Sequence, residues 1–269
     1  MSATLVQSVL GPSFTSSGTG GSPFTTTVAG SVAFPNPTTA GNLIIVVTAN
    51  MQQKTGGSGT FNSIGGTSPT VQRSASLFHT FSPGNQVFYS DTFPTAGTSY
   101  GGFTLWSWVN ASALSPATDV IQIHASNTAS ASLQWALQNE FAIFEFGNID
   151  PTETIVHVLN SNFSSAGGTT DPGNATLASD QELLMVIGVG DRSLGSNVSA
   201  GSGFTLGPNM TVATIGQFQW QNAGNAGVYP AAFGGSMSTR WGAESFAIKT
   251  NTVSPPSGVW NNVTHVVVS

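Results

Sequence analysis

Residues 43–47 read LIIVV and residues 183–187 read LLMVI. Both runs have the length of a strand and are apolar at every position, with neither Gly nor Pro inside them. Side chains alternate between the two faces of a strand, so a fully apolar run has two apolar faces. Strands of this kind are typical of the middle of a sheet that other layers cover on both sides. The two runs therefore predict two central strands of a layered β structure.

Around these runs the chain repeats one theme, in which short β-branched and aromatic runs alternate with clusters of Gly, Pro, Asn, Asp and Ser. Strands are expected at 25–34, 43–49, 71–81, 86–91, 103–109, 120–125, 140–146, 154–159, 182–190, 211–220 and 241–249. Turns are expected at 35–37, 56–57, 83–85, 171–173 and 207–209. Residues 131–139 fit either a short helix or a strand that continues into 140–146. This pattern predicts an all-β fold, an antiparallel β-sandwich or jelly roll.

The two ends of the chain have a different composition. Residues 1–24 are rich in Gly, Ser and Thr and contain Pro12 and Pro23, which indicates an extended N-terminal arm. Residues 251–269 read as a C-terminal tail whose apolar stretch 265–268 forms a possible edge strand. We therefore expect one sandwich domain at 25–250. Both ends should add little to its core and should instead contact neighbouring subunits.

Charged residues are scarce. They make up 6% of the 269 residues, against about 25% in an ordinary soluble domain. A surface of neutral polar side chains carries little repulsion between neighbouring molecules, which favours an assembly subunit. The five basic residues are scattered and the net charge is −6, so nucleic-acid binding is not expected. The basic residues are Lys54, Arg73, Arg192, Arg240 and Lys249.

The sequence also bounds the compartment and the cofactors. It contains no cysteine, which excludes disulfides and thiolate metal sites. The first residues lack a basic start followed by a long apolar segment, so no signal peptide is expected. The longest apolar runs are far too short to span a bilayer, and no membrane insertion is expected. No bound cofactor or metal is expected either.

Six short stretches in a fixed order carry a resemblance to a known family. They are 32–34 (VAF), 39–47 (TAGNLIIVV), 141–150 (FAIFEFGNID), 179–186 (SDQELLMV), 203–205 (GFT) and 241–249 (WGAESFAIK). With them the chain resembles, over residues 6–249, a jelly-roll-like β-sandwich family of phage minor tail and other virion proteins and some bacterial surface proteins. One departure is Phe146, where the family commonly has Tyr. The stretches record packing and turns, so the resemblance implies a virion context and no catalytic residue.

No reactive constellation is visible. There is no Gly-x-Ser-x-Gly nucleophile motif, and no two of the four histidines have metal-ligand spacing on one element. Glu140 and Glu145 are five positions apart on one expected strand, so their side chains face opposite sides and cannot flank one glycosidic bond. Glu145 shares its face with apolar residues. We expect it to lie at the margin of a sheet or to bond Arg73, Arg240 or a backbone amide, rather than to act in catalysis. The same interpretation applies to Glu244 in the last expected strand.

Two oxygen-rich loops, 150–153 (DPTE) and 171–174 (DPGN), admit two interpretations. Such loops suit Ca²⁺, which prefers oxygen ligands. More often they are turns in which an Asp side chain bonds its own backbone. The turn is the interpretation adopted here.

One segment combines aromatic and amide side chains, as a site for neutral sugars would. The candidate ligand-binding residues are Trp220, Asn222, Asn225 and Tyr229. Core or interface packing is the competing interpretation of the two aromatic residues.

The first functional hypothesis is a non-enzymatic structural protein of the virion, assembled in the host cytoplasm. It would be a capsid decoration or a minor tail or fibre subunit that contacts itself and other virion proteins. The alternative is a carbohydrate-binding adhesin that recognises host-surface glycans. An enzyme is not expected.

Overall fold

The computed structural model describes residues 2–19, 24–57, 61–90, 99–129, 133–164, 168–190, 199–208, 210, 215–235 and 241–251. Within these residues the chain forms strands and no helix. The strands are β1 Thr4–Leu10, β2 Phe14–Thr19, β3 Phe24–Val32, β4 Leu43–Gly57, β5 Phe61–Arg73, β6 Ser76–Thr80, β7 Ser82–Ser90, β8 Ser99–Trp108, β9 Asp119–Ala129, β10 Leu133–Gly147, β11 His157–Ser164, β12 Ala175–Leu177, β13 Glu182–Gly190, β14 Thr205–Leu206, β15 Ile215–Ala223, β16 Gly227–Tyr229 and β17 Trp241–Lys249. The described part of the chain thus has no helix long and apolar enough to cross a membrane.

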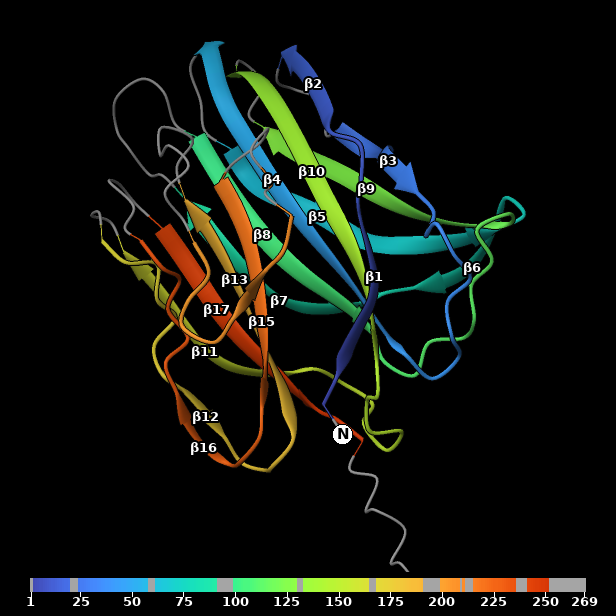
Figure 1. The fold of residues 1–269 in the computed structure, drawn as a ribbon. Coiled ribbons are helices and arrows are strands. Elements are labelled where there is room, and N and C mark those ends of the chain that lie inside the picture. Colours follow the sequence, from blue (N-terminus) through green and yellow to red (C-terminus); the bar gives the residue numbers. More distant parts are fainter. Residues whose placement is uncertain are drawn as a thin grey trace, which may run out of the picture.

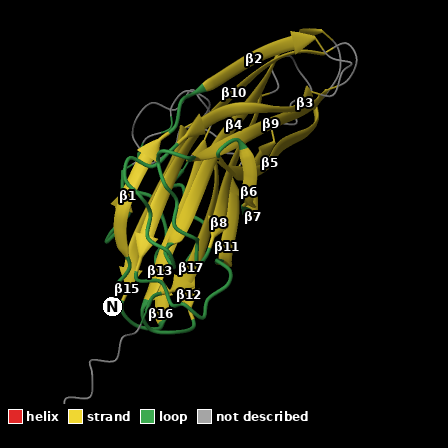
Figure 2. Ribbon diagram, turned by 90° about the vertical axis from the view of Figure 1, so that its right-hand side faces the viewer, coloured by secondary structure: helices red, strands yellow, loops and turns green. Residues whose placement is uncertain are grey.

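The strands form antiparallel sheets stacked in layers, so the predicted all-β sandwich is confirmed (Figure 1). The central sheet has the order β1-β10-β4-β8-β7, with β2 also paired to β10. The β13 sheet has the order β11-β17-β13-β15-β14, and the β9 sheet has the order β3-β9-β5-β6. A small hairpin sheet pairs β12 with β16. Figure 2 shows the long strands following the long dimension of the molecule.

The central sheet is buried on both faces, as the run at 43–47 predicted. On β4, Leu43, Ile45 and Val47 belong to one core cluster, which also holds residues of the β13 sheet such as Met185 and Phe246. The alternate residues Ile44 and Val46 belong to a second cluster, shared with residues of β5 and β9. Each fully buried aliphatic or aromatic side chain contributes roughly 1.5–3 kcal/mol, so the two layers hold the three sheets together.

The second apolar run is covered on both faces in the same way. On β13, Leu183, Met185 and Ile187 face the central sheet. Leu184 and Val186 lie in a third cluster, beneath the small β12–β16 sheet and the neighbouring loops. Both fully apolar runs are therefore middle strands of covered sheets.

The segment 131–139 is a strand wherever it is described. Its described part belongs to β10, which pairs with β4 from Leu133↔Gly57 to Phe146↔Leu43. The alternative of a short helix is wrong because this long pairing outweighs the local helix preference of the segment.

The N-terminal segment is extended, as predicted, but it is not an arm outside the sandwich. β1 and β2 both pair with β10 and together form one edge of the central sheet. Between them, Gly11 donates its backbone N–H to the carbonyl of Phe141 at 2.8 Å. A Cβ atom on Gly11 would overlap the ring of Phe141, so only glycine fits this close approach. A boundary after residue 24 would therefore separate β1 and β2 from β10, the strand with which both pair.

Other expected boundaries also change. The strand expected at 71–81 is a hairpin of β5 and β6, in which Ser74 and Ala75 have φ values of 49° and 65°. Residues 83–85, expected as a turn, lie inside β7, where the pairing with β8 shifts register. The short strands β12, β14 and β16 were not expected. Residues 252–269, with the expected edge strand, lie outside the described residues.

Candidate functional site

Among the described residues, Glu145 is the most deeply buried carboxylate, with an exposed fraction of 0%. Its Oε1 accepts hydrogen bonds from Asn42 Nδ2 at 2.6 Å and from the backbone N–H of Thr39 at 2.8 Å. Its Oε2 accepts one from Gln7 Nε2 at 2.6 Å. The expected bond to a backbone amide is therefore confirmed, with Thr39 as the donor. Because both oxygens hold neighbouring segments in place, Glu145 is a structural carboxylate that fastens β1 and the 39–42 loop to β10.

The other two glutamates considered for catalysis are also inside the fold. Glu140 and Glu145 lie on opposite faces of β10, as predicted, since Phe141 and Ile143 belong to one core cluster and Ala142 and Phe144 to the other. Glu140 and Glu244 are 5% and 3% exposed. A glycosidase needs two carboxyl groups beside a sugar, and such buried positions give a polysaccharide no access to them.

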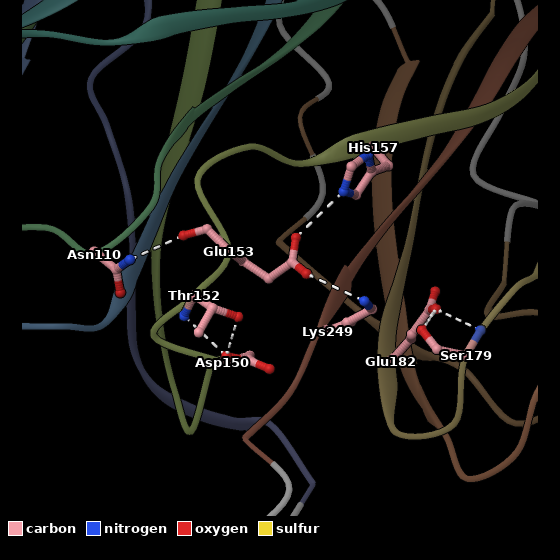
Figure 3. A network of polar contacts seen from close by, with 8 residues as sticks. All are labelled: Asn110, Asp150, Thr152, Glu153, His157, Ser179, Glu182 and Lys249. Atoms are coloured by element: carbon pink, nitrogen blue, oxygen red, sulfur yellow. Dashed lines mark hydrogen bonds and ion pairs between the residues drawn. The ribbon is translucent and has the colours of Figure 1, made fainter.

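The loop at 150–153 is a turn that its own side chains stabilise (Figure 3). Asp150 Oδ1 accepts hydrogen bonds from the backbone N–H of Thr152 at 2.8 Å and from its hydroxyl at 2.7 Å. The first of these bonds is the main reason that the pKa of Asp150 is lowered. Beside it, Glu153 contacts His157 Nε2 at 3.2 Å and Lys249 Nζ at 3.7 Å. The cluster thus links the loop to β11 and β17.

The loop at 171–174 follows the same principle. Asp171 Oδ1 accepts the backbone N–H of Gly173 at 2.8 Å, and Gly173 has a φ of 95° that favours glycine. Both loops are therefore turns in which an Asp side chain bonds the nearby backbone, as expected from the sequence. Across the described ranges, no three His, Cys, Asp or Glu side chains gather closely enough to hold a metal ion.

The predicted sugar-binding residues do not form one exposed patch. Trp220 is 8% exposed and lies in the core between the central and β13 sheets. Its ring packs at centroid distances of 5.4 Å from Phe218, 5.6 Å from Phe146 and 5.9 Å from Phe144. The competing interpretation, core packing, is therefore the one the structure supports. Trp220 has no free face on which a sugar could stack.

The three remaining candidates have structural contacts of their own. Asn222 bonds the backbone of Ala3 with both ends of its amide. Tyr229 is half-buried, and its hydroxyl donates to the carbonyl of Asn225 at 2.8 Å. Asn225 is exposed at the tip of the β15–β16 connection. Asn222, Asn225 and Tyr229 are thus at least partly exposed, but without Trp220 they do not form the aromatic and amide patch expected from the sequence.

A cluster that the sequence interpretation missed lies on the β5–β6 hairpin. Arg73 makes a two-pronged ion pair with Asp119, with N–O distances of 2.7 and 2.8 Å. These hydrogen bonds are the main reason that the pKa of Asp119 is lowered. The Cζ atom of Arg73 also lies 3.7 Å from the centroid of the Phe78 ring. In a single continuous strand at 71–81, as the sequence predicted, Arg73 and Phe78 could not meet. The turn at Ser74 and Ala75 folds β6 back on β5 and brings the two side chains together.

Aromatic rings continue this cluster into the core. His79 stacks on Trp108 with ring centroids 3.7 Å apart, and Phe81 meets Trp108 edge to face. Burial lowers the pKa of His79, because desolvation disfavours the charged form of its ring. The cluster closes the end of the layer between the central and β9 sheets.

The distribution of charge is the feature with the clearest functional meaning. Nine of the eleven acidic residues lie in the described part of the chain. Six of these nine are less than 10% exposed, namely Asp119, Glu140, Glu145, Glu153, Glu182 and Glu244. Every Asp, Glu, Lys and Arg in a described strand lies in β4, β5, β9, β10, β13 or β17, and each of these strands is paired on both sides. The described part of the surface, and the described sheet edges above all, are therefore even less charged than the composition indicates.

No protein-family model, no curated protein and no solved structure matches this chain. The resemblance to the virion β-sandwich family therefore rests on the short stretches in the sequence alone.

Proposed function

We propose that this protein is a non-enzymatic structural subunit of a virion, either a capsid decoration or a minor tail or fibre component. The observation that carries the proposal is the burial of six of the nine described acidic residues inside an already charge-poor sandwich. Of the described acidic residues, only Asp150, Asp171 and Asp180 remain outside, and the rest of the described polar surface is mainly Ser, Thr, Asn, Gln and Gly. Copies of such a surface pack closely without like-charge repulsion, and this is what a dense repeating shell or fibre needs.

The contacts of the buried acids support the same proposal. Glu145, Asp119 and Glu153 each fasten segments from different parts of the chain. The carboxylates that an enzyme would present in a cleft are used here to hold loops and strands together. A rigid scaffold with a neutral exterior is the result.

The test is the location of the protein in particles. Particles are purified on a density gradient from a culture that expresses the protein. Each fraction is then digested and analysed by mass spectrometry. Chymotrypsin is the suitable protease, because 17 Phe residues give many cleavage sites whereas Lys and Arg together number only 5.

We expect peptides of this chain to follow the particle band through the gradient. A soluble enzyme of the same culture serves as the control and should stay at the top. Recovery of the chain only in the soluble fractions would overturn the proposal.

A further inference from the structure

The edges of the sheets are protected in an unusual way. Exposed edge strands present unpaired N–H and C=O groups, and proteins commonly prevent unwanted pairing there with Lys, Pro or a β-bulge. Six edge strands of at least five residues are described, namely β1, β2, β3, β6, β7 and β11, and none contains Asp, Glu, Lys or Arg. Charge therefore protects none of these edges.

Irregular pairing takes the place of charge on five of the six. The register shifts within the pairing of β1 with β10, β3 with β9, β6 with β5, β7 with β8 and β11 with β17. Such bulges twist a strand and break the regular row of free backbone groups, so that a second edge cannot lie flat against it. β7 also contains Pro83, which lacks the N–H that a partner strand would use.

β2 is the exception. Its six residues, FTSSGT, pair with β10 in unbroken register from Asn139↔Phe14 to Gln134↔Thr19. Among the described strands only β10 pairs with β2, so its other edge is open. Thr15 and Ser17 are exposed, and no side chain of β2 carries a charge. The fold thus leaves one regular, unguarded edge at the end of its central sheet.

We infer that the open edge of β2 is an interface between two copies of this chain, in which β2 pairs antiparallel with β2 of the second copy. This inference deepens the proposed function and rests on it, because it supplies the contact through which subunits assemble. Two central sheets would join into one continuous sheet across a two-fold axis, the commonest symmetry of protein dimers.

A second copy is the occupant that the chemistry of the edge favours. A strand that carries charges of one sign repels its own copy, because antiparallel pairing brings the like charges of the two strands close together. β2 is neutral throughout. After Phe14 it contains only Thr, Ser and Gly, whose small size lets the edges of two sheets approach closely. The register follows from the backbone. Outward-facing N–H and C=O groups belong to alternate residues, so the axis must pass through one residue paired with itself, and Ser16 and Ser17 stand at the middle.

This geometry gives a direct test by cross-linking, since the chain contains no cysteine. Residues facing each other across an antiparallel pair have Cα atoms about 4.5–5.5 Å apart, within the range that a disulfide bridges. The variants Ser16→Cys and Ser17→Cys are prepared separately in the full chain and oxidised gently. We expect one of them to form a disulfide-linked dimer rapidly. Ser8→Cys in β1 and Ser161→Cys in β11, both exposed on bulged edges, are the matched controls and should not.

A second experiment measures the association without a cross-link. Ser17→Lys places two like charges near the axis and should weaken dimerisation in analytical ultracentrifugation by roughly tenfold or more. Ser8→Lys is the control and should leave it unchanged. Circular dichroism and melting curves verify that both variants fold.

Three outcomes overturn the inference: a monomeric wild type at high concentration, no cross-link at either serine, or a dimer that survives Ser17→Lys. Loss of the dimer on deletion of 252–269, with no effect of Ser17→Lys, assigns the contact to the tail and also overturns it. Particle fractionation is a separate readout. If the protein pairs through β2 but is absent from particles, this inference holds and the proposed function is wrong. If the protein is present in particles but does not pair through β2, the proposed function holds and this inference is wrong.

Discussion

The side-chain amide of Asn222 in β15 makes two hydrogen bonds to the backbone of Ala3 near the start of the chain. Its Oδ1 accepts the N–H of Ala3 at 2.8 Å, and its Nδ2 donates to the carbonyl of Ala3 at 3.0 Å. Two residues separated by 219 positions are thereby joined by a pair of hydrogen bonds. The contact fastens the beginning of the central sheet to the β13 sheet.

Replacing Asn222 with Ala should lower the free energy of unfolding by about 1–3 kcal/mol, because two backbone groups of Ala3 lose their partners. Urea unfolding followed by Trp fluorescence measures the change. The exposed Asn225→Ala is the control and should stay within about 0.5 kcal/mol of wild type. Equal stability of the two variants would show that the hydrogen bonds between Asn222 and Ala3 contribute nothing to the free energy of unfolding.

Gly11→Ala should destabilise the protein by about 1–3 kcal/mol, since the added methyl group overlaps the Phe141 ring in a packed layer. Gly224→Ala is the matched control, because a Cβ at Gly224 meets no atom within 4 Å. Thermal melting of both variants checks the prediction. A normal melting curve for Gly11→Ala would mean that the N-terminal segment does not pack as the structure describes.

Glu145→Gln should be more harmful than its small change in shape suggests. The three groups that surround the carboxylate are all donors, from Gln7, Thr39 and Asn42, and a Gln side chain would turn an NH₂ group toward at least one of them. A loss of about 2–4 kcal/mol is expected from a buried, unsatisfied polar contact. Chemical denaturation gives the value. A change below about 0.5 kcal/mol would contradict the structural role of Glu145.

The Arg73–Asp119 ion pair predicts a loss of stability in acid. The pKa of Asp119 is lower in the folded state than its ordinary value of 3.8, mainly because Arg73 donates hydrogen bonds to it. Its contribution is therefore fully present above about pH 4 and is lost as the pH falls through the lowered value. Asp119→Asn should be less stable than wild type at pH 7, and the difference should shrink toward pH 2. Parallel stability curves for the two proteins between pH 7 and 2 would refute this assignment.

Removal of metal ions should have no effect. The acidic side chains of the loops at 150–153 and 171–174 bond their own backbone, so we expect the melting temperature to stay within a few degrees in excess EDTA. Differential scanning calorimetry with and without the chelator measures it. A larger drop, restored by added Ca²⁺, would make these loops calcium sites.

Local patterns in the sequence were sufficient for part of this fold. The fully apolar runs at 43–47 and 183–187 predicted covered middle strands, and the five-residue spacing of Glu140 and Glu145 predicted their opposite faces. These predictions hold because the alternation of side chains is a property of the extended backbone itself. It does not depend on which strand lies next to it.

Only the tertiary structure decided which strands pair and which side chains are buried. Nothing in a Ser/Thr/Gly-rich N-terminus reveals that Leu10 pairs with Ala142, or that β2 forms an open edge. Alternation could place Trp220 on a face, but only the rings of Phe144, Phe146 and Phe218 made that face the core. The burial of a side chain depends on segments brought together from far along the chain, and strand preferences change with that environment. For this reason the sequence predicted the strands and the faces of their side chains, while the layers above them decided which residues are buried and which edge is free.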